Sequence, residues 1–120
     1  MKYYLFFAVA MLTTCCSNGQ VKIKLEDISK HVGDSVTVCG KVAGIRFIKQ
    51  SKNTPTFMNV GAAYPNQLLT VVIWGDVRKQ YETAPEVLFK DKEVCITGKV
   101  ELYKEKAQIV VNDKKQLVIQ

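Results

Sequence analysis

Two stretches, one in each half of the chain, repeat a single pattern. Residues 36–42 read VTVCGKV, and residues 94–100 read VCITGKV. In both, aliphatic residues alternate with Thr, Cys or Lys, which is typical of a β-strand with one buried face. Gly40 lies in the first stretch and Gly44 just after it, and a glycine inside a strand indicates a bulge or a tight bend. The repeat predicts two long bent strands with related places in one small closed sheet, and the second of them is expected to cover Glu93 to Tyr103.

The rest of the chain predicts three more strands and one short helix. Strands are expected at three apolar segments, with a short edge pairing near the C-terminus: Thr56–Val60, Leu68–Trp74, Ala107–Val111 and Leu117–Ile119. A helix is expected after Trp74, because Val77, Tyr81 and Leu88 recur at near-helical spacing. Asp76 suits the N-terminal cap of this helix. Pro85 interrupts it, so an irregular turn should follow.

The first residues form a separate segment. One cation, Lys2, precedes an uncharged apolar run from Tyr3 to Leu12. The run has about half of the ~20 residues that a membrane-spanning helix needs, and it suits the hydrophobic part of a secretory signal. We therefore expect an exported protein. Residues 1–14 would form the signal peptide, residues 15–27 a tether and approach segment, and residues 28–120 the folded domain.

The end of the apolar run, Leu12-Thr13-Thr14-Cys15, resembles a bacterial lipobox. The resemblance implies cleavage before Cys15 and a lipid on its sulfur, which would anchor the protein to a membrane in the periplasm or at the cell surface. Thr14 departs from the Gly, Ala or Ser that is usual before the cysteine, and Cys16 is an alternative lipid acceptor. A free periplasmic protein with an ordinary signal peptide is the other interpretation.

Five strands with a helix between the third and the fourth resemble the OB-fold, a Greek-key β-barrel. The residues that carry the resemblance are VGDSVTVCGKV at 32–42, TFMNVG at 56–61 and VCITGKVELY at 94–103. They look like the tRNA-anticodon-binding type of OB domain and its relatives among exported bacterial proteins. The resemblance implies an all-β, five-stranded barrel with one short helix. Its second and third strands would hold an oligonucleotide or an oligosaccharide.

The same barrel order implies that the first and fourth strands pair in antiparallel fashion. If Thr37 lies opposite Thr97, then Cys39 lies opposite Cys95. An exported protein can keep a disulfide. The two cysteines are therefore either bonded to each other or two buried free thiols.

Catalytic constellations are missing from the sequence. His31 is the only histidine, and no base is evident near Cys39. A nuclease of the OB-like type needs several carboxylates and arginines in one pocket, whereas Arg46 and Arg78 are the only arginines and the acids are scattered. We expect a protein that is not an enzyme and has no metal or cofactor, with a tethered nuclease as a minor alternative.

Candidate ligand-binding residues come from strand alternation. If Met58 and Val60 fill the barrel, Phe57 and Asn59 face outward. On the next strand, the same alternation turns Thr70, Val72 and Trp74 outward. The same alternation and the loops give the full candidate set: Phe57, Asn59, Tyr64 and Trp74, with Lys41, Arg46, Lys49, Lys99 and Tyr103 along the groove. Aromatic rings beside cations suit bases of a single strand, which stack on rings while their phosphates meet the cations. Each ring is alternatively part of the core, since one bulge reverses the alternation.

The charge of the chain is compatible with such a ligand but does not select it. Removing Lys2 with the signal peptide lowers the net charge of +6 by one, to about +5. A modest positive field attracts nucleic acid, anionic lipid and polyanionic glycan alike. We expect a membrane-tethered module that binds single-stranded DNA or RNA. The alternative is an envelope module for a glycan, a peptide, a small ligand or a partner protein.

Overall fold

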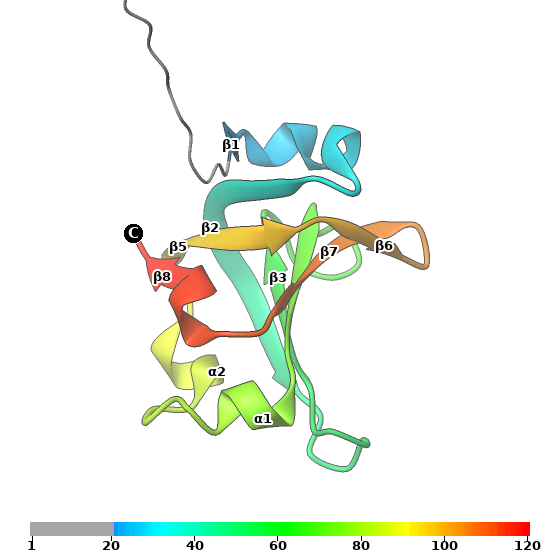
Figure 1. Cartoon of the computed structure of the whole chain (residues 1–120). Helices are drawn as coiled ribbons and strands as arrows, with labels where there is room; N and C mark the ends of the chain where they lie inside the picture. Colours follow the sequence, from blue (N-terminus) through cyan, green and yellow to red (C-terminus); the bar gives the residue numbers. More distant parts are fainter. Residues whose placement is uncertain (1–20) are drawn as a thin grey trace, which may run out of the picture.

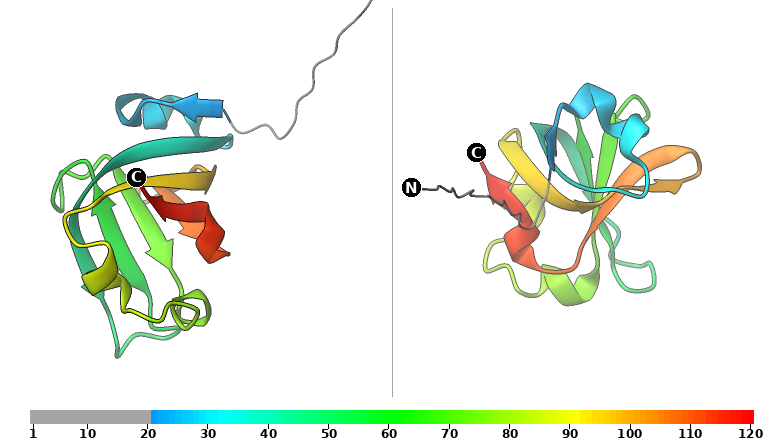
Figure 2. Two further views of the ribbon diagram at one scale, coloured as in Figure 1. Left: turned by 90° about the vertical axis from the view of Figure 1, so that its left-hand side faces the viewer. Right: turned by 45° about the horizontal axis from the view of Figure 1, so that its top comes forward.

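The computed structural model describes residues 21–120, which fold into two β-sheets joined by one long strand (Figure 1). The expected signal peptide and both candidate lipid acceptors, Cys15 and Cys16, lie outside the described residues. The joining strand is β2 (Ser35–Phe47), which curves along its length and takes part in both sheets (Figure 2). The sequence predicted this strand to be long and bent at a glycine. A register shift lies between Val42 and Gly44.

Each half of β2 has its own partners. The first half pairs with β1 (Val21–Ile23) in parallel and with β5 (Glu93–Lys99) in antiparallel fashion, and β8 (Leu117–Ile119) adds to the far edge of β5. The second half pairs with β3 (Thr56–Val60), and the sheet continues through β4 (Leu69–Ile73), β7 (Lys106–Val111) and β6 (Glu101–Tyr103). The β8 edge pairing at residues 117–119 agrees with the prediction.

The prediction of a closed five-stranded barrel is not confirmed in that form. The eight strands form an open arrangement: seven follow one hydrogen-bonded path from β6 at one end to β8 at the other, and β1 lies off this path beside β2. The stretch expected as one strand from Glu93 to Tyr103 is split at Val100 into β5 and β6. It splits because the backbone of Val100 bonds to the turn before β2 instead: its N–H donates to Asp34 O, and its carbonyl accepts from Gly33 N. Through Val100 the chain thus connects β6, at one end of the path, with β5, the strand next to the other end.

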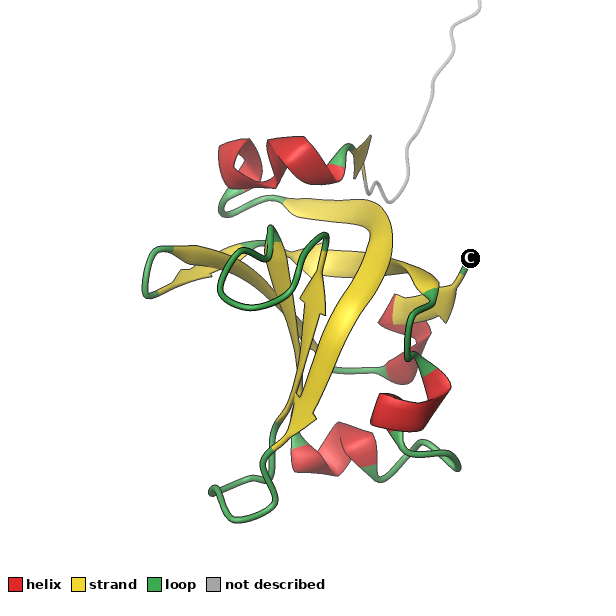
Figure 3. Ribbon diagram, turned by 180° about the vertical axis from the view of Figure 1, so that it is seen from behind, coloured by secondary structure: helices red, strands yellow, loops and turns green. Residues whose placement is uncertain are grey.

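Short helices cover the two ends of the sheets (Figure 3). The 3-10 helix η1 (Leu25–His31) lies over one end and buries Leu25 and Ile28. At the other end lie α1 (Gly75–Arg78) and α2 (Pro85–Leu88), where Val77 and Phe89 join the core. Residues 21–27, expected as tether and approach, therefore include β1 and a core residue. A further 3-10 turn, η2 (Lys114–Gln116), precedes β8.

The helical region between β4 and β5 differs from the prediction of one short helix capped by Asp76. Two four-residue helices occupy it. Trp74 is the N-cap residue of α1, and it makes no side-chain capping bond; Asp76 lies in the first turn instead. Pro85 starts α2 as its first residue, which suits a residue with a fixed φ and no N–H to bond.

An arginine ties this helical end to the sheet. The Arg78 guanidinium donates two hydrogen bonds to the Glu86 carboxylate, of 2.7 and 2.9 Å, and one to Thr56 Oγ1 of 2.9 Å. Its Cζ atom lies 3.5 Å from the centre of the Phe47 ring, a cation–π contact. The hydrogen bonds from Arg78 hold the pKa of the Glu86 carboxyl below its usual value. We call Phe47, Thr56, Arg78 and Glu86 the Arg78 clamp.

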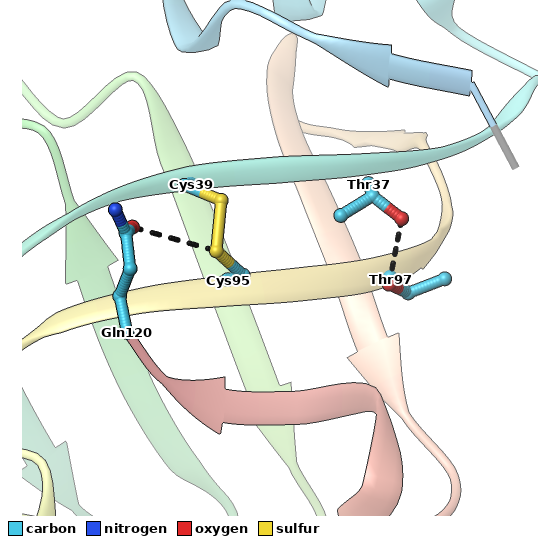
Figure 4. Close-up of a disulfide and its surroundings, with 5 residues drawn as sticks. All are labelled: Thr37, Cys39, Cys95, Thr97 and Gln120. Carbon is cyan, nitrogen blue, oxygen red and sulfur yellow. Dashed lines mark hydrogen bonds between the residues drawn. A yellow bond between two sulfur atoms is a disulfide. The ribbon is translucent and has the colours of Figure 1, made fainter.

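On the outer side of the first sheet, β2 and β5 are joined by a disulfide between Cys39 and Cys95 (Figure 4). The register places Thr37 opposite Thr97 and Cys39 opposite Cys95, the arrangement in which the sequence allowed a disulfide in place of two free thiols. The two threonine hydroxyls share a hydrogen bond of 2.8 Å. Gln120 Oε1 lies 3.5 Å from Cys95 Sγ, a packing contact, because a disulfide sulfur has no hydrogen to donate. We call Thr37, Cys39, Cys95 and Thr97 the disulfide ladder.

Candidate binding groove

One hollow of the described chain crosses the outer side of the second sheet. It is a groove of about 540 Å³. The residues that line it come from five strands, the loops that follow β2 and β3, and the β6–β7 turn: Arg46, Ile48, Phe57, Asn59, Tyr64, Pro65, Gln67, Thr70, Tyr103, Lys104, Lys106, Ala107 and Gln108. We refer to this set as the groove.

Residues that face outward from β3, β4 and β7 form the floor of the groove. On β3, Met58 and Val60 are fully buried, so Phe57 and Asn59 face the opposite side, as the sequence predicted. Register then aligns polar residues across the sheet, because Asn59 lies opposite Thr70 and Thr70 lies opposite Gln108. The floor therefore carries a row of amide and hydroxyl groups across three strands.

A second row runs beside the polar one and provides the ring and the cation of the floor. Arg46 on β2 lies opposite Phe57 on β3, and Phe57 lies opposite Val72 on β4. Val72 was expected to point outward with Thr70, yet it is only 2% exposed although it is not part of the core cluster. Part of the outer side of this sheet, around Val72, is therefore shielded from solvent. The half-buried Phe57 ring is left as the flat apolar surface of the floor.

The walls of the groove are the β3–β4 loop and the β6–β7 hairpin. Tyr64, which is 74% exposed, and Pro65 come from the loop, and Tyr103 and Lys104 come from the hairpin. Lys106 Nζ donates a 2.8 Å hydrogen bond to Pro65 O and so connects the two walls. Lys104 Nζ lies 5.4 Å from the centre of the Tyr103 ring. Three aromatic rings and three cations thus surround one hollow.

The charge of the groove has one sign. Arg46, Lys104 and Lys106 line it, and within residues 21–120 no Asp or Glu does. The nearest acid bonded to a lining residue is Glu101, whose Oε1 accepts from Gln108 Nε2 at 3.5 Å. Aromatic surface beside unopposed cations can hold a flat, negatively charged molecule through stacking and ionic contact.

Five of the nine predicted ligand-binding residues meet in this groove: Arg46, Phe57, Asn59, Tyr64 and Tyr103. The other four do not line it. Lys41 lies on β2 opposite Glu93, Lys99 lies opposite Ser35 at the end of β5, and exposed Lys49 follows Ile48. Trp74, 39% exposed, lies beyond the end of β4 at the start of α1.

Sequence reasoning missed several groove residues, including Gln67, Thr70 and Lys106. Thr70 was expected to face outward, and its position opposite Asn59 was available once the β3–β4 register was known. Lys104 and Lys106 flank the tip of a hairpin that the sequence did not predict as a groove wall. Among the described residues, no group of three His, Cys, Asp or Glu side chains is placed to hold a metal ion.

Comparison with known proteins shows likeness in structure alone. No protein family model matches the chain, and no curated protein matches its sequence. Among solved structures, the chain is similar to a yeast Stn1 and Ten1 structure, with a TM-score of 0.59 and 13% identity over 85% of this chain and 63% of that one. It is similar to a protein described as an aspartyl-tRNA synthetase from Leishmania major Friedlin, with a TM-score of 0.52 and 12% identity over 93% of this chain.

The present chain spans 23% of the length of that synthetase. A third similar structure is an OBody bound to hen egg-white lysozyme, with a TM-score of 0.53 and 17% identity over 86% of this chain and 96% of the OBody. These neighbours are OB-fold proteins. At such low identity the likeness shows the fold: residues 21–120 are a mostly β domain of the OB-fold type.

Proposed function

We propose that this protein is a membrane-tethered, non-enzymatic module whose groove binds single-stranded nucleic acid. The observation that carries the proposal is the composition of the groove. It combines the rings of Phe57, Tyr64 and Tyr103 with three cations, and no acid lines it within residues 21–120. Stacking of bases on rings contributes about 1–3 kcal/mol for each base. Cations next to the rings supply the contacts for the phosphates.

The position of the groove in the fold supports the same ligand. In OB-folds the face of the second and third strands, with the loops beside it, binds oligonucleotides or oligosaccharides. Here β3 and β4 form the middle of the floor. Proteins named Stn1, Ten1 and an aspartyl-tRNA synthetase share the fold. Nucleic-acid ligands are common among such neighbours.

The tether belongs to the same proposal and is supported by the sequence alone. The apolar run at the N-terminus suits export, and Cys15 stands where a lipobox places its acceptor. No helix within residues 21–120 has the length and apolar character needed to cross a membrane. Labelling with a radioactive fatty acid should mark the wild type and the Cys16→Ala variant but not Cys15→Ala. Loss of label in Cys16→Ala alone would move the acceptor to Cys16.

A titration tests the binding proposal. The mature protein should bind fluorescein-labelled single-stranded DNA or RNA at low salt, and its affinity should fall steeply as salt rises, because bound phosphates release counterions. Cell-wall fragments serve as the comparison ligand. If no oligonucleotide bound at low salt, the nucleic-acid proposal would be withdrawn. A metal-dependent loss of the DNA that chelator abolished would contradict the non-enzymatic part.

One observation favours a second candidate, an envelope module that binds a protein or a glycan. The hairpin that forms one wall exposes Leu102 and Tyr103, and exposed rings and aliphatic residues suit a partner surface as well as a base. An OBody of the same fold was solved bound to a protein, lysozyme. Co-purification of an envelope protein from cross-linked cells, lost on Tyr103→Ser, would favour this candidate over the first.

A further inference from the structure

Gln67 stands out among the residues of the groove because its side chain is buried and incompletely bonded. It is only 7% exposed, and it is one of two buried polar residues in the described chain, the other being Thr56. Its Nε2 donates a 3.0 Å hydrogen bond to Thr70 Oγ1. Its Oε1 has no hydrogen-bond partner within residues 21–120. A buried carbonyl oxygen without a donor costs free energy, so its presence calls for an explanation.

The amide lacks one partner whichever way it is turned. In the structure, Nε2 bonds to Thr70 and Oε1 is free. Turning the amide over would let the Thr70 hydroxyl donate to Oε1, but Nε2 would then lack an acceptor. The hydroxyl of Thr70 thus serves only one end of the amide. The other end is available for a group that enters the groove.

The loop that carries Gln67 is largely exposed, and a lysine bond ties it to the opposite wall of the groove. Tyr64, largely exposed, and Pro65 precede it in the β3–β4 loop, and the carbonyl of Pro65 is bonded to the exposed Lys106 ammonium. A phosphate offers Lys106 a stronger partner than a neutral carbonyl does, because the bond then joins opposite charges. Binding of a nucleotide can therefore exchange the Lys106–Pro65 bond for an ionic contact and free the loop that carries Gln67.

We infer that Gln67 determines base preference in the groove, by accepting a hydrogen bond from the exocyclic amino group of a stacked base. This inference rests on the proposed binding of single-stranded nucleic acid. The amino group of cytosine or adenine projects from the edge of the ring, so it can reach a recessed oxygen. The N3–H of thymine lies between two carbonyl oxygens, which would face Oε1 with like partial charge. Cytosine is therefore preferred over thymine, a pyrimidine of the same size.

The test compares oligo(dC) with oligo(dT) of equal length by fluorescence anisotropy at neutral pH and low salt. We expect the mature protein to bind oligo(dC) about tenfold more tightly, the ratio that one well-placed polar contact gives. Gln67→Met has nearly the same shape but no acceptor oxygen of this kind, and it should bring the ratio close to one. Gln80→Met, the same change at an exposed residue that does not line the groove, should keep the preference.

A second measurement uses the wild type alone, so it does not depend on whether a variant folds. In the wild type, the side-chain amide resonances of Gln67 should shift on addition of oligo(dC) and much less with oligo(dT). Equal affinities of the wild type for the two oligonucleotides, or a preference that persists in Gln67→Met, would overturn the inference while leaving the proposed function in place. A preference for oligo(dT) would overturn the acceptor role as well, since it corresponds to the opposite amide orientation. Absence of binding to either oligonucleotide would remove both proposals.

Discussion

The two halves of β2 lie in surfaces of opposite character. The first half belongs to the disulfide ladder, where a covalent bond and a threonine pair join β2 to β5. The second half borders the groove, where Arg46 and Phe57 face a hollow of about 540 Å³. The ladder is closed by bonds between its own residues. The groove has rings, cations and one buried oxygen that its own residues do not satisfy.

This difference suggests a division of roles along one strand. Binding sites carry exposed rings and unpaired polar groups, and these features usually lower stability. A disulfide restricts the unfolded chain, and more so when the loop it closes is long. Cys39 and Cys95 are 56 residues apart. Since the cross-link lies on the other sheet, it can stabilise the fold without occupying the groove. If the roles are separate, changes in one region should leave the property of the other nearly intact.

The largest expected effect is on stability, from loss of the disulfide. Replacing Cys39 and Cys95 together by Ser removes the cross-link. The chain-entropy model predicts a loss of about 4 kcal/mol in the free energy of unfolding for a loop of this length. Urea unfolding of wild type and variant measures the change. The dissociation constant for single-stranded DNA, measured in the cold where the variant is folded, should change less than about twofold. A large loss of affinity in the folded variant would mean that the two regions are coupled.

The next effect is on binding, from the ring in the floor of the groove. Phe57→Leu keeps an apolar side chain but removes the stacking surface, and it should cost about 1–3 kcal/mol of oligonucleotide binding. Its effect on urea unfolding should be smaller than that of the disulfide variant, since Phe57 is only half-buried. Trp74→Leu is the matched control, because the indole does not line the groove. Equal loss in both variants would place the binding surface elsewhere.

Phe57 and Trp74 also show which side-chain positions could be predicted from the sequence and which could not. Alternation along β3 placed Phe57 correctly, because a regular strand fixes the side to which each residue points. The same alternation treated Trp74 as a strand residue. The strand ends at Ile73, and the backbone of Trp74 starts α1 instead. The end of a strand depends on what the next segment packs against, and the period of the sequence does not contain that information.

The cysteines and Val100 show the same limit for the pairing of strands: a regular pairing could be predicted, whereas the place where a strand breaks could not. Antiparallel pairing in the implied barrel order, with Thr37 set opposite Thr97, placed Cys39 opposite Cys95, and the structure has this register. The break at Val100 could not be predicted in this way, because it is caused by hydrogen bonds to Gly33 and Asp34, far away in the chain. Loop residues were harder still. Gln67 and Lys106 meet in the groove only because the β3–β4 loop and the β6–β7 hairpin lie on the same side of the sheet.

A smaller effect, with a specific pH dependence, is expected at the Arg78 clamp, none of whose residues belongs to the disulfide ladder or lines the groove. The pKa of Glu86 is lowered in the folded state, chiefly by its hydrogen bond to Arg78. Its contribution to stability is therefore present above the unfolded pKa of about 4.3 and is lost as the pH falls through the folded value. Glu86→Gln should cost on the order of 1 kcal/mol at neutral pH.

The measurement is urea unfolding of wild type and Glu86→Gln at neutral pH and in acid. The difference between the two proteins should shrink as the pH falls below the folded pKa of Glu86, because both side chains are then uncharged. Oligonucleotide affinity at neutral pH should be unchanged, since Glu86 does not line the groove. A stability difference that stayed constant down to acid pH would mean that the charge of Glu86 contributes nothing.

The smallest effect concerns one charge in each region. Lys106 lines the groove, whereas Lys41 lies on β2 opposite Glu93 and outside it. A plot of log affinity against log salt has a negative slope. If Lys106 contacts a phosphate, Lys106→Gln should make this slope less steep by about 0.7, the value for one contact with a single strand. Lys41→Gln removes the same charge from the protein but no contact, so its slope should match that of the wild type. Lys106→Arg keeps the charge and should restore the slope. Equal slopes for both glutamine variants would mean that the net charge of the domain, and not the groove, attracts the strand.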